Sequence, residues 1–129
     1  MSINRFHNVT NPYQGSRTKT LCVCSAGLLR SPTLAFILSK PPYNRNTRAV
    51  GHSQEYALIP IDAALVHWAD EIVFVDEESY SSVLKNGFDV SKKRVVTLSV
   101  PDVYDAFSEE LIIKINSQLV DAGFNYECK

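Results

Sequence analysis

The sequence lacks most features that would place it outside the ordinary globular proteins. Its 129 residues include three cysteines, an odd number that does not suggest a disulfide framework. Basic and acidic residues nearly balance, 13 against 14, so charge favours neither nucleic acid nor a membrane surface as a partner. No apolar run approaches the roughly 20 residues of a membrane span, and the polar first residues lack the apolar core of a secretory signal.

Metal-ligand spacing is also missing from the chain. His7, His52 and His67 are scattered, and the cysteines do not stand at the spacing of zinc ligands. We therefore expect no metal and no other cofactor. The small number of cysteines favours a reducing compartment, and we expect the protein in the cytoplasm.

The length and the 45% hydrophobic content predict one domain with a substantial core. Residues 1–17 contain Asn, Pro and Gly with little apolar periodicity, so we interpret them as an N-terminal arm. Residues 18–129 are then the folded domain. No internal repeat or low-complexity tract divides them.

Within the domain, strand-like and helix-like segments alternate. Strands are predicted over 19–24, 47–50, 71–75 and 94–98. The predicted helices are 31–39 before Pro41 and Pro42, a segment around 61–68 with Pro60 near its start, one capped by Asp76 and running to Leu84, and a last one between Phe107 and Gly123. This alternation predicts a three-layer α/β/α fold with a four-stranded parallel sheet.

The most informative motif lies between the first predicted strand and the first predicted helix. Cys24 is followed by five residues and then by Arg30 and Ser31. A loop that opens a helix directs backbone N–H groups and the positive end of the helix dipole at one point, where an anion binds. The expected phosphate-binding residues are Ser25, Ala26, Gly27, Leu28, Leu29 and Arg30.

The same loop predicts a nucleophile. The positive field that binds a phosphate also favours the thiolate of Cys24, which is the reactive form of cysteine. The guanidinium of Arg30 has the donor geometry to hold phosphate oxygens. Ser31 is expected to donate its hydroxyl to the sulfur and to assist its departure from a phosphocysteine.

A proton donor for the leaving oxygen is expected after the fourth strand. Carboxyl ends of parallel strands meet at one edge of a sheet, so residues 99–105 should lie beside the Cys24 loop. Asp102 is the expected general acid and base, with Asp105 as the fallback or as the cap of the last helix. Tyr104 is expected to line the substrate pocket.

At these residues the chain resembles the low-molecular-weight protein tyrosine phosphatases. The family has a Cys-x5-Arg-Ser/Thr loop near its N-terminus and an Asp-Pro-Tyr segment near its C-terminus. The likeness is greatest to short bacterial and phage members, which carry runs similar to Leu29-Arg30-Ser31-Pro32-Thr33 and Val100-Pro101-Asp102-Val103-Tyr104. It covers roughly residues 19–120.

The resemblance implies a flavodoxin-like sheet of strand order 2-1-3-4, without a metal. It implies phosphomonoester hydrolysis through a phosphocysteine on Cys24, with Asp102 as general acid and base. The implied substrates are a phosphorylated protein, above all one bearing phosphotyrosine, or a small aryl phosphate. Inorganic phosphate would be the product and an inhibitor.

Three positions depart from the family pattern. Gly27 stands where the family usually has asparagine in a left-handed conformation, and Ala49 stands where a serine is expected. Both ends of one supporting network are then absent, which predicts a looser loop and weaker activity. Val103 replaces the family's proline and removes one rigid element from the acid-bearing segment.

Two other functions remain open from the sequence. One is a module that binds phosphate or phosphotyrosine with little catalysis, which Gly27 and Ala49 favour. The other is arsenate reduction, which ranks lower because no resolving cysteine occurs between Cys24 and Cys128. Cys22 shares a strand face with Cys24 and is interpreted as a buried small hydrophobe rather than a redox partner.

Overall fold

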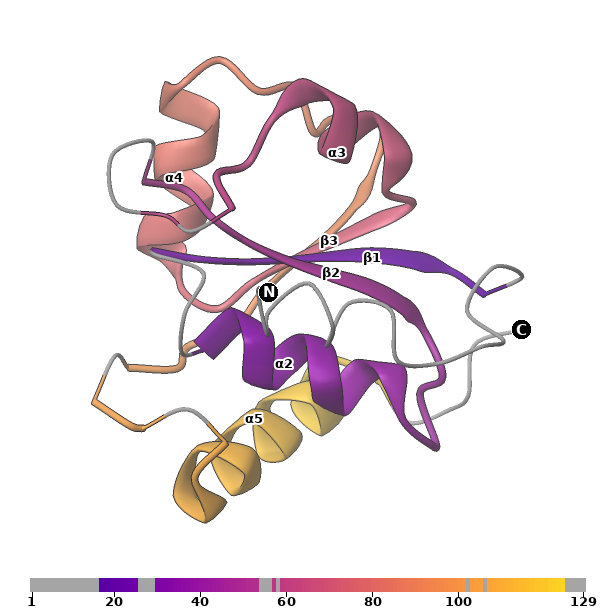
Figure 1. Ribbon diagram of the computed structural model, residues 1–129, viewed down its shortest axis with the longest axis vertical. Coiled ribbons are helices and arrows are strands. Elements are labelled where there is room, and N and C mark those ends of the chain that lie inside the picture. The colour runs from indigo at the N-terminus through magenta and orange to yellow at the C-terminus, as the bar shows by residue number, and fades with distance from the viewer. Residues whose placement is uncertain are drawn as a thin grey trace.

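The domain is a four-stranded sheet with helices on both faces (Figure 1). A computed structural model describes residues 17–25, 30–53, 57, 59–101, 103–105 and 107–124, so residues 1–16 of the predicted arm lie outside it. Its elements are β1 (Lys19–Cys24), α2 (Arg30–Ser39), β2 (Asn46–Gly51), α3 (Ala63–Trp68), β3 (Glu71–Phe74), α4 (Glu77–Lys85), β4 (Arg94–Thr97) and α5 (Glu109–Asp121).

The sheet confirms the predicted topology. Every neighbouring pair of strands is parallel, and the order is β2-β1-β3-β4. β1 and β3 are therefore the inner strands, and Cys22 on β1 stands opposite Ala49 on β2 and Val73 on β3. Because β1 is an inner strand, its last residue, Cys24, lies near the middle of the edge formed by the carboxyl ends of the strands.

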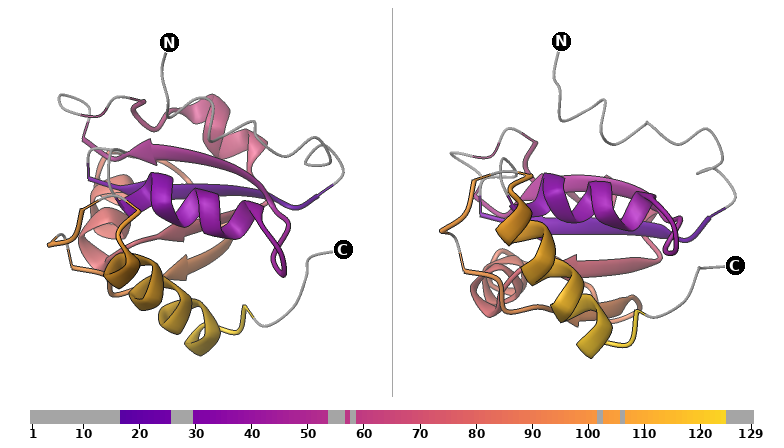
Figure 2. Two further views of the ribbon diagram at one scale, coloured as in Figure 1. Left: turned by 60° about the horizontal axis from the view of Figure 1, so that its bottom comes forward. Right: turned by 90° about the horizontal axis from the view of Figure 1, so that it is seen from below.

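Alternate residues of β1 supply two separate cores. Cys22 and Cys24 face α2 and α5, which cover one side of the sheet, as Figure 2 shows for those two helices. Leu21 and Val23 face the opposite side, where α3 and α4 pack. Strand periodicity of two places both cysteines on one face, as the sequence predicted.

Side-chain caps define where three of the helices begin. Asp62, Asp76 and Ser108 each accept a hydrogen bond from the backbone N–H three residues later, at the starts of α3, α4 and α5. The predicted Asp76 cap is thus confirmed. Gly123, with φ of 92°, follows the last helix as expected.

Pro60 lies near the start of α3, as predicted, where it forms an isolated bridge with Gly51, and Asp62 is the cap. The predicted start of the last helix is wrong in one detail. Asp105 does not cap α5, because Ser108 has that role and Phe107 stands before the helix with φ of 59°. In both cases the chain makes a tertiary contact before the helix starts, which local pattern does not encode.

A buried charge cluster closes the edge of the sheet where the strands begin. Glu71 accepts hydrogen bonds from Thr20 and Arg45, both at 2.7 Å, and Arg94 lies 3.2 Å from its second oxygen. The two guanidiniums also lie 4.7 and 4.9 Å from the ring centre of Phe124, which follows α5. This cluster joins β1, β3, β4 and the end of α5, and lies at the opposite edge from Cys24.

Candidate active site

Cys24 is the last residue of β1, and hydrogen bonds on both sides hold the chain around it. Its carbonyl accepts a bond from the N–H of His52 at 2.8 Å, and the carbonyl of Ser25 accepts one from Ser53 at 3.0 Å. On the β3 side, the N–H of Val75 donates to Val23 at 3.0 Å. The backbone is therefore fixed up to the first residue of the predicted phosphate loop.

Ser31 brings the start of α2 against the cysteine. The Cys24 sulfur and the Ser31 hydroxyl oxygen are 3.1 Å apart, and both residues are buried. The Ser31 hydroxyl also lies 3.2 Å from the carbonyl oxygen of Val50. A hydroxyl has one hydrogen, so it donates either to Val50 or to the sulfur.

The single hydrogen of the Ser31 hydroxyl is shared differently in the thiol and thiolate forms of Cys24, so the predicted donation from Ser31 to the thiolate stays a prediction. With Cys24 protonated, the S–H donates to the Ser31 oxygen, and the Ser31 hydroxyl donates to Val50. Donation from Ser31 to a thiolate requires the hydroxyl to turn away from the Val50 carbonyl. The contact itself is the one expected from the spacing of the motif.

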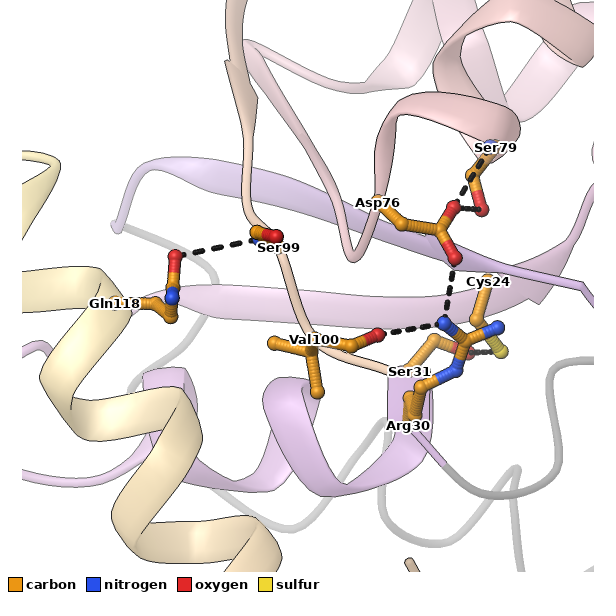
Figure 3. Close-up of polar contacts among 8 residues, drawn as sticks. All are labelled: Cys24, Arg30, Ser31, Asp76, Ser79, Ser99, Val100 and Gln118. Atoms are coloured by element: carbon orange, nitrogen blue, oxygen red, sulfur yellow. Dashed lines mark hydrogen bonds and ion pairs between the residues drawn. The ribbon is translucent and has the colours of Figure 1, made fainter. Parts of the chain in front are cut away.

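Arg30 is the first residue of α2, and its side chain is almost fully buried. One terminal nitrogen donates to the Asp76 carboxylate at 2.6 Å and to the carbonyl oxygen of Val100 at 2.8 Å. Figure 3 shows the guanidinium between these two acceptors, close to Cys24 and Ser31. The arginine therefore connects α2, the end of β3 and the segment after β4.

Asp76 is the residue of this site that the sequence analysis missed. One carboxylate oxygen accepts bonds from the Ser79 backbone and hydroxyl at 2.8 and 2.7 Å, and the other accepts from Arg30. Burial acts to raise the pKa of Asp76, but the hydrogen bonds from Ser79 and Arg30 outweigh it and lower that pKa. One feature of the sequence could have identified Asp76 as a site residue. It follows the strand β3, which is the neighbour of β1 in the sheet, so the two strands end side by side.

The segment after β4 reaches the candidate site at Val100. Its N–H donates to the carbonyl of Val75 at 2.9 Å, while its own carbonyl accepts from Arg30. The predicted meeting of this segment with the Cys24 loop therefore holds up to Val100. Beyond it, Pro101 is exposed and Val103 is 75% exposed.

Tyr104 packs partly against the core on the α2 and α5 side of the sheet. It also lines a cleft of about 390 Å³ whose other described walls are residues of α5. The sequence predicted Tyr104 at the mouth of a substrate pocket. The described contacts place it against α5, at the far end of the segment that begins with Val100.

Several predicted site residues lie outside the described residues. These are Ala26, Gly27, Leu28 and Leu29 of the phosphate loop and the expected acid Asp102. The expectations about the loop amides, the left-handed Gly27 and the proton donor therefore stay predictions. The structure describes the first and last residues of the loop, Ser25 and Arg30, and the residues on either side of it, Cys24 and Ser31.

Cys22 is fully buried behind Cys24. Burial, and then the nearby charges of Glu71 and Cys24, raise the pKa of the Cys22 thiol well above its usual value. The thiol therefore stays protonated at neutral pH. This environment fits a small core side chain, as the sequence predicted, and contrasts with the setting expected for a nucleophile.

Comparison with family models, with curated protein sequences and with solved structures gives no match to this chain. In the part of the chain that the structure describes, no helix has the length and apolar character needed to cross a bilayer. Among the same residues, no three His, Cys, Asp or Glu side chains are grouped to hold a metal ion.

Proposed function

We propose that the protein is a cysteine-dependent phosphomonoester hydrolase that acts on phosphotyrosine in proteins or on small aryl phosphates. The observation that carries this proposal is the meeting of Cys24 and Ser31 at the first turn of α2, with Arg30 beside them. Three residues of the Cys-x5-Arg-Ser motif thus converge at the carboxyl edge of a parallel sheet, where such folds bind ligands.

In the proposed first step, the Cys24 thiolate attacks the phosphorus of the bound ester. The sulfur–phosphorus bond forms as the bond from phosphorus to the leaving oxygen breaks, and Asp102 gives that oxygen its proton. Arg30 and the loop amides stabilise the charge on the three other phosphate oxygens. The role of Asp102 rests on the family resemblance.

In the second step, water attacks the phosphocysteine. Asp102, now ionised, takes a proton from that water as the oxygen–phosphorus bond forms and the sulfur leaves. The Ser31 hydroxyl lies 3.1 Å from the sulfur and can turn to donate to it as negative charge returns. Inorganic phosphate is released and competes with substrate for the same loop.

The named residues supply every group that the two steps use, so the proposed mechanism includes no metal or cofactor. It does require a reduced Cys24, which a cytoplasmic location would provide. We therefore place the proposed activity in the cytoplasm, with phosphorylated polypeptides or aryl phosphates as partners.

The test is hydrolysis of p-nitrophenyl phosphate by matched variants of the two strand cysteines. Wild type should release nitrophenol, and Cys24→Ser should lose the activity because serine is not ionised at neutral pH. Cys22→Ala is the control, since that buried thiol lies two residues away on the same face and has no proposed role in the reaction. Full activity of Cys24→Ser would end the proposal.

One observation favours a second candidate, a phosphate-binding module with little catalysis. Arg30 is already held by the Asp76 carboxylate and by the Val100 carbonyl, so a phosphate must share it with an anion. Such a module would bind phosphotyrosine without turnover. Calorimetric binding by wild-type protein that hydrolyses neither phosphotyrosine nor p-nitrophenyl phosphate would select it.

A further inference from the structure

The segment between β4 and α5 is attached to α2 at both ends, and its first attachment is to Arg30 of the candidate active site. At its start, the carbonyl of Val100 accepts the hydrogen bond from Arg30 at 2.8 Å. At its end, the N–H of Phe107 donates to the Thr33 hydroxyl at 3.0 Å, and its ring packs edge-on against Phe36 at 5.6 Å between centres. Phe107 adopts a left-handed φ of 59°, which bulky residues rarely do, so these contacts define its conformation.

This segment and α5 together line a cleft. Tyr104 forms one wall, and Glu110, Ile113, Lys114 and Ser117 on α5 form the other. Its volume, about 390 Å³, falls in the roughly 300–1,000 Å³ range of sites for small ligands. The Ser99 N–H also donates to Gln118 at 3.3 Å, so the segment is tied to the side of α5 as well (Figure 3).

The lining of the cleft favours an uncharged, apolar occupant. Ile113 is 61% exposed, and Val103 on the adjoining segment is 75% exposed, both unusual for large aliphatic side chains. Glu110 and Lys114 stand four residues apart on α5 with opposite charges, so the rim of the cleft has no net charge. A strongly acidic or basic side chain would gain little there, whereas an apolar one would cover Ile113.

We propose that this cleft, defined by Tyr104, Glu110, Ile113, Lys114 and Ser117, binds an apolar side chain near the phosphorylated residue of a polypeptide substrate. The inference rests on the proposed function, since it places the phosphate at the Cys24 loop. A small aryl phosphate ends at the loop, but a polypeptide continues along the segment from Val100 to Tyr104. The preferred substrate is then a phosphorylated protein rather than a small metabolite.

The test uses short phosphotyrosine peptides in which one leucine replaces serine at successive positions on both sides of the phosphotyrosine. At one position, wild type should prefer leucine by about fivefold in kcat/KM, the effect of partly burying one such side chain. Ile113→Asp should reduce this preference to near parity. Val120→Asp is the matched control, because Val120 is 54% exposed on the same helix but outside the cleft, and it should keep the preference.

The outcomes separate the two proposals. Equal use of all peptides, or a leucine preference that survives in Ile113→Asp, would overturn the cleft and leave the phosphatase standing. If wild type hydrolyses neither peptides nor p-nitrophenyl phosphate, the phosphatase fails instead. Fluorescence anisotropy of the labelled peptides then tests the cleft by binding alone. Binding that is equal with leucine or serine overturns the cleft, and a leucine preference that Ile113→Asp removes supports it.

Discussion

At the scale of single residues, the candidate site depends on how a few hydrogen atoms are shared. The Ser31 hydroxyl lies within reach of both the Cys24 sulfur and the Val50 carbonyl, and it donates to one at a time. Donation to the sulfur therefore requires the hydroxyl to turn away from Val50. The motif gives the residue types, but the competing acceptor comes from β2 and is visible only in the fold.

Asp76 allows the Arg30 ion pair to be tested apart from helix capping. Asparagine caps helices as well as aspartate does, so Asp76→Asn can keep the Ser79 contacts through its one amide oxygen. Its NH2 group takes the place of the oxygen that accepts from Arg30, so both the charge and that hydrogen bond are lost. We expect a loss of about 2 kcal/mol in the free energy of unfolding at pH 7, because a buried guanidinium is left without its counterion. Urea titration measures it.

The same variant predicts a pH dependence. Folding lowers the pKa of Asp76, so its contribution to stability is complete above the ordinary value of 3.8 and is lost as pH falls through the folded value. The difference between wild type and Asp76→Asn should therefore shrink in acid. Asp62→Asn is the control, since Asp62 caps α3 through Leu65 in the same manner and its change should be small at every pH. A constant difference down to the acid transition would contradict this account.

At the scale of elements, the buried Glu71 cluster holds the starts of three strands and the end of α5 together. Glu71→Gln keeps the shape of the side chain but leaves Arg45 without a full counterion in a buried position. We expect it to lower the free energy of unfolding by about 3 kcal/mol. Glu77→Gln, at an exposed position in the first turn of α4, should cost about 0.5 kcal/mol or less.

Because the cluster lies at the opposite edge from Cys24, Glu71→Gln should leave turnover of p-nitrophenyl phosphate unchanged well below its unfolding temperature. Denaturation curves and rates on the same samples make the comparison. Equal stability of the Glu71 and Glu77 variants would show that the ion pairs contribute nothing net.

The sequence predicted the elements well where one physical signal dominated. Apolar runs of strand length and the Asp76 cap are local, and the structure has them at the expected places. What it missed is long-range: the Arg30–Asp76 pair spans 46 residues, and Arg45 meets Glu71 across 26. No local pattern encodes such partners until the strand order is known. In the site, the motif predicted the contact between Cys24 and Ser31. It did not predict that Asp76, besides capping α4, accepts a hydrogen bond from Arg30.

At the scale of the whole molecule, the two hydrophobic cores pack on opposite faces of the same sheet. We therefore expect them to unfold in one cooperative transition. Leu119 is fully buried on the α5 side, while Trp68, the one tryptophan in the sequence, packs on the α3 side. Leu119→Ala should lower the free energy of unfolding by about 3 kcal/mol. Its urea transitions by Trp68 fluorescence and by far-ultraviolet circular dichroism should coincide, as a two-state domain requires.

Val120→Ala provides the comparison for that experiment. Val120 is the next residue of α5 but is 54% exposed, so its loss should be within about 0.5 kcal/mol. If Leu119→Ala shifted the circular dichroism transition and left the tryptophan transition in place, the two faces of the sheet would be separate cooperative units.

The placement of Glu71 and Cys24 at opposite ends of the strands has a practical use. A linker fixed beside the strand starts would present the cysteine edge outward on a sensor chip or chromatography bead. Immobilised in that orientation, the protein could be screened against mixtures of peptides without the support blocking access to Arg30.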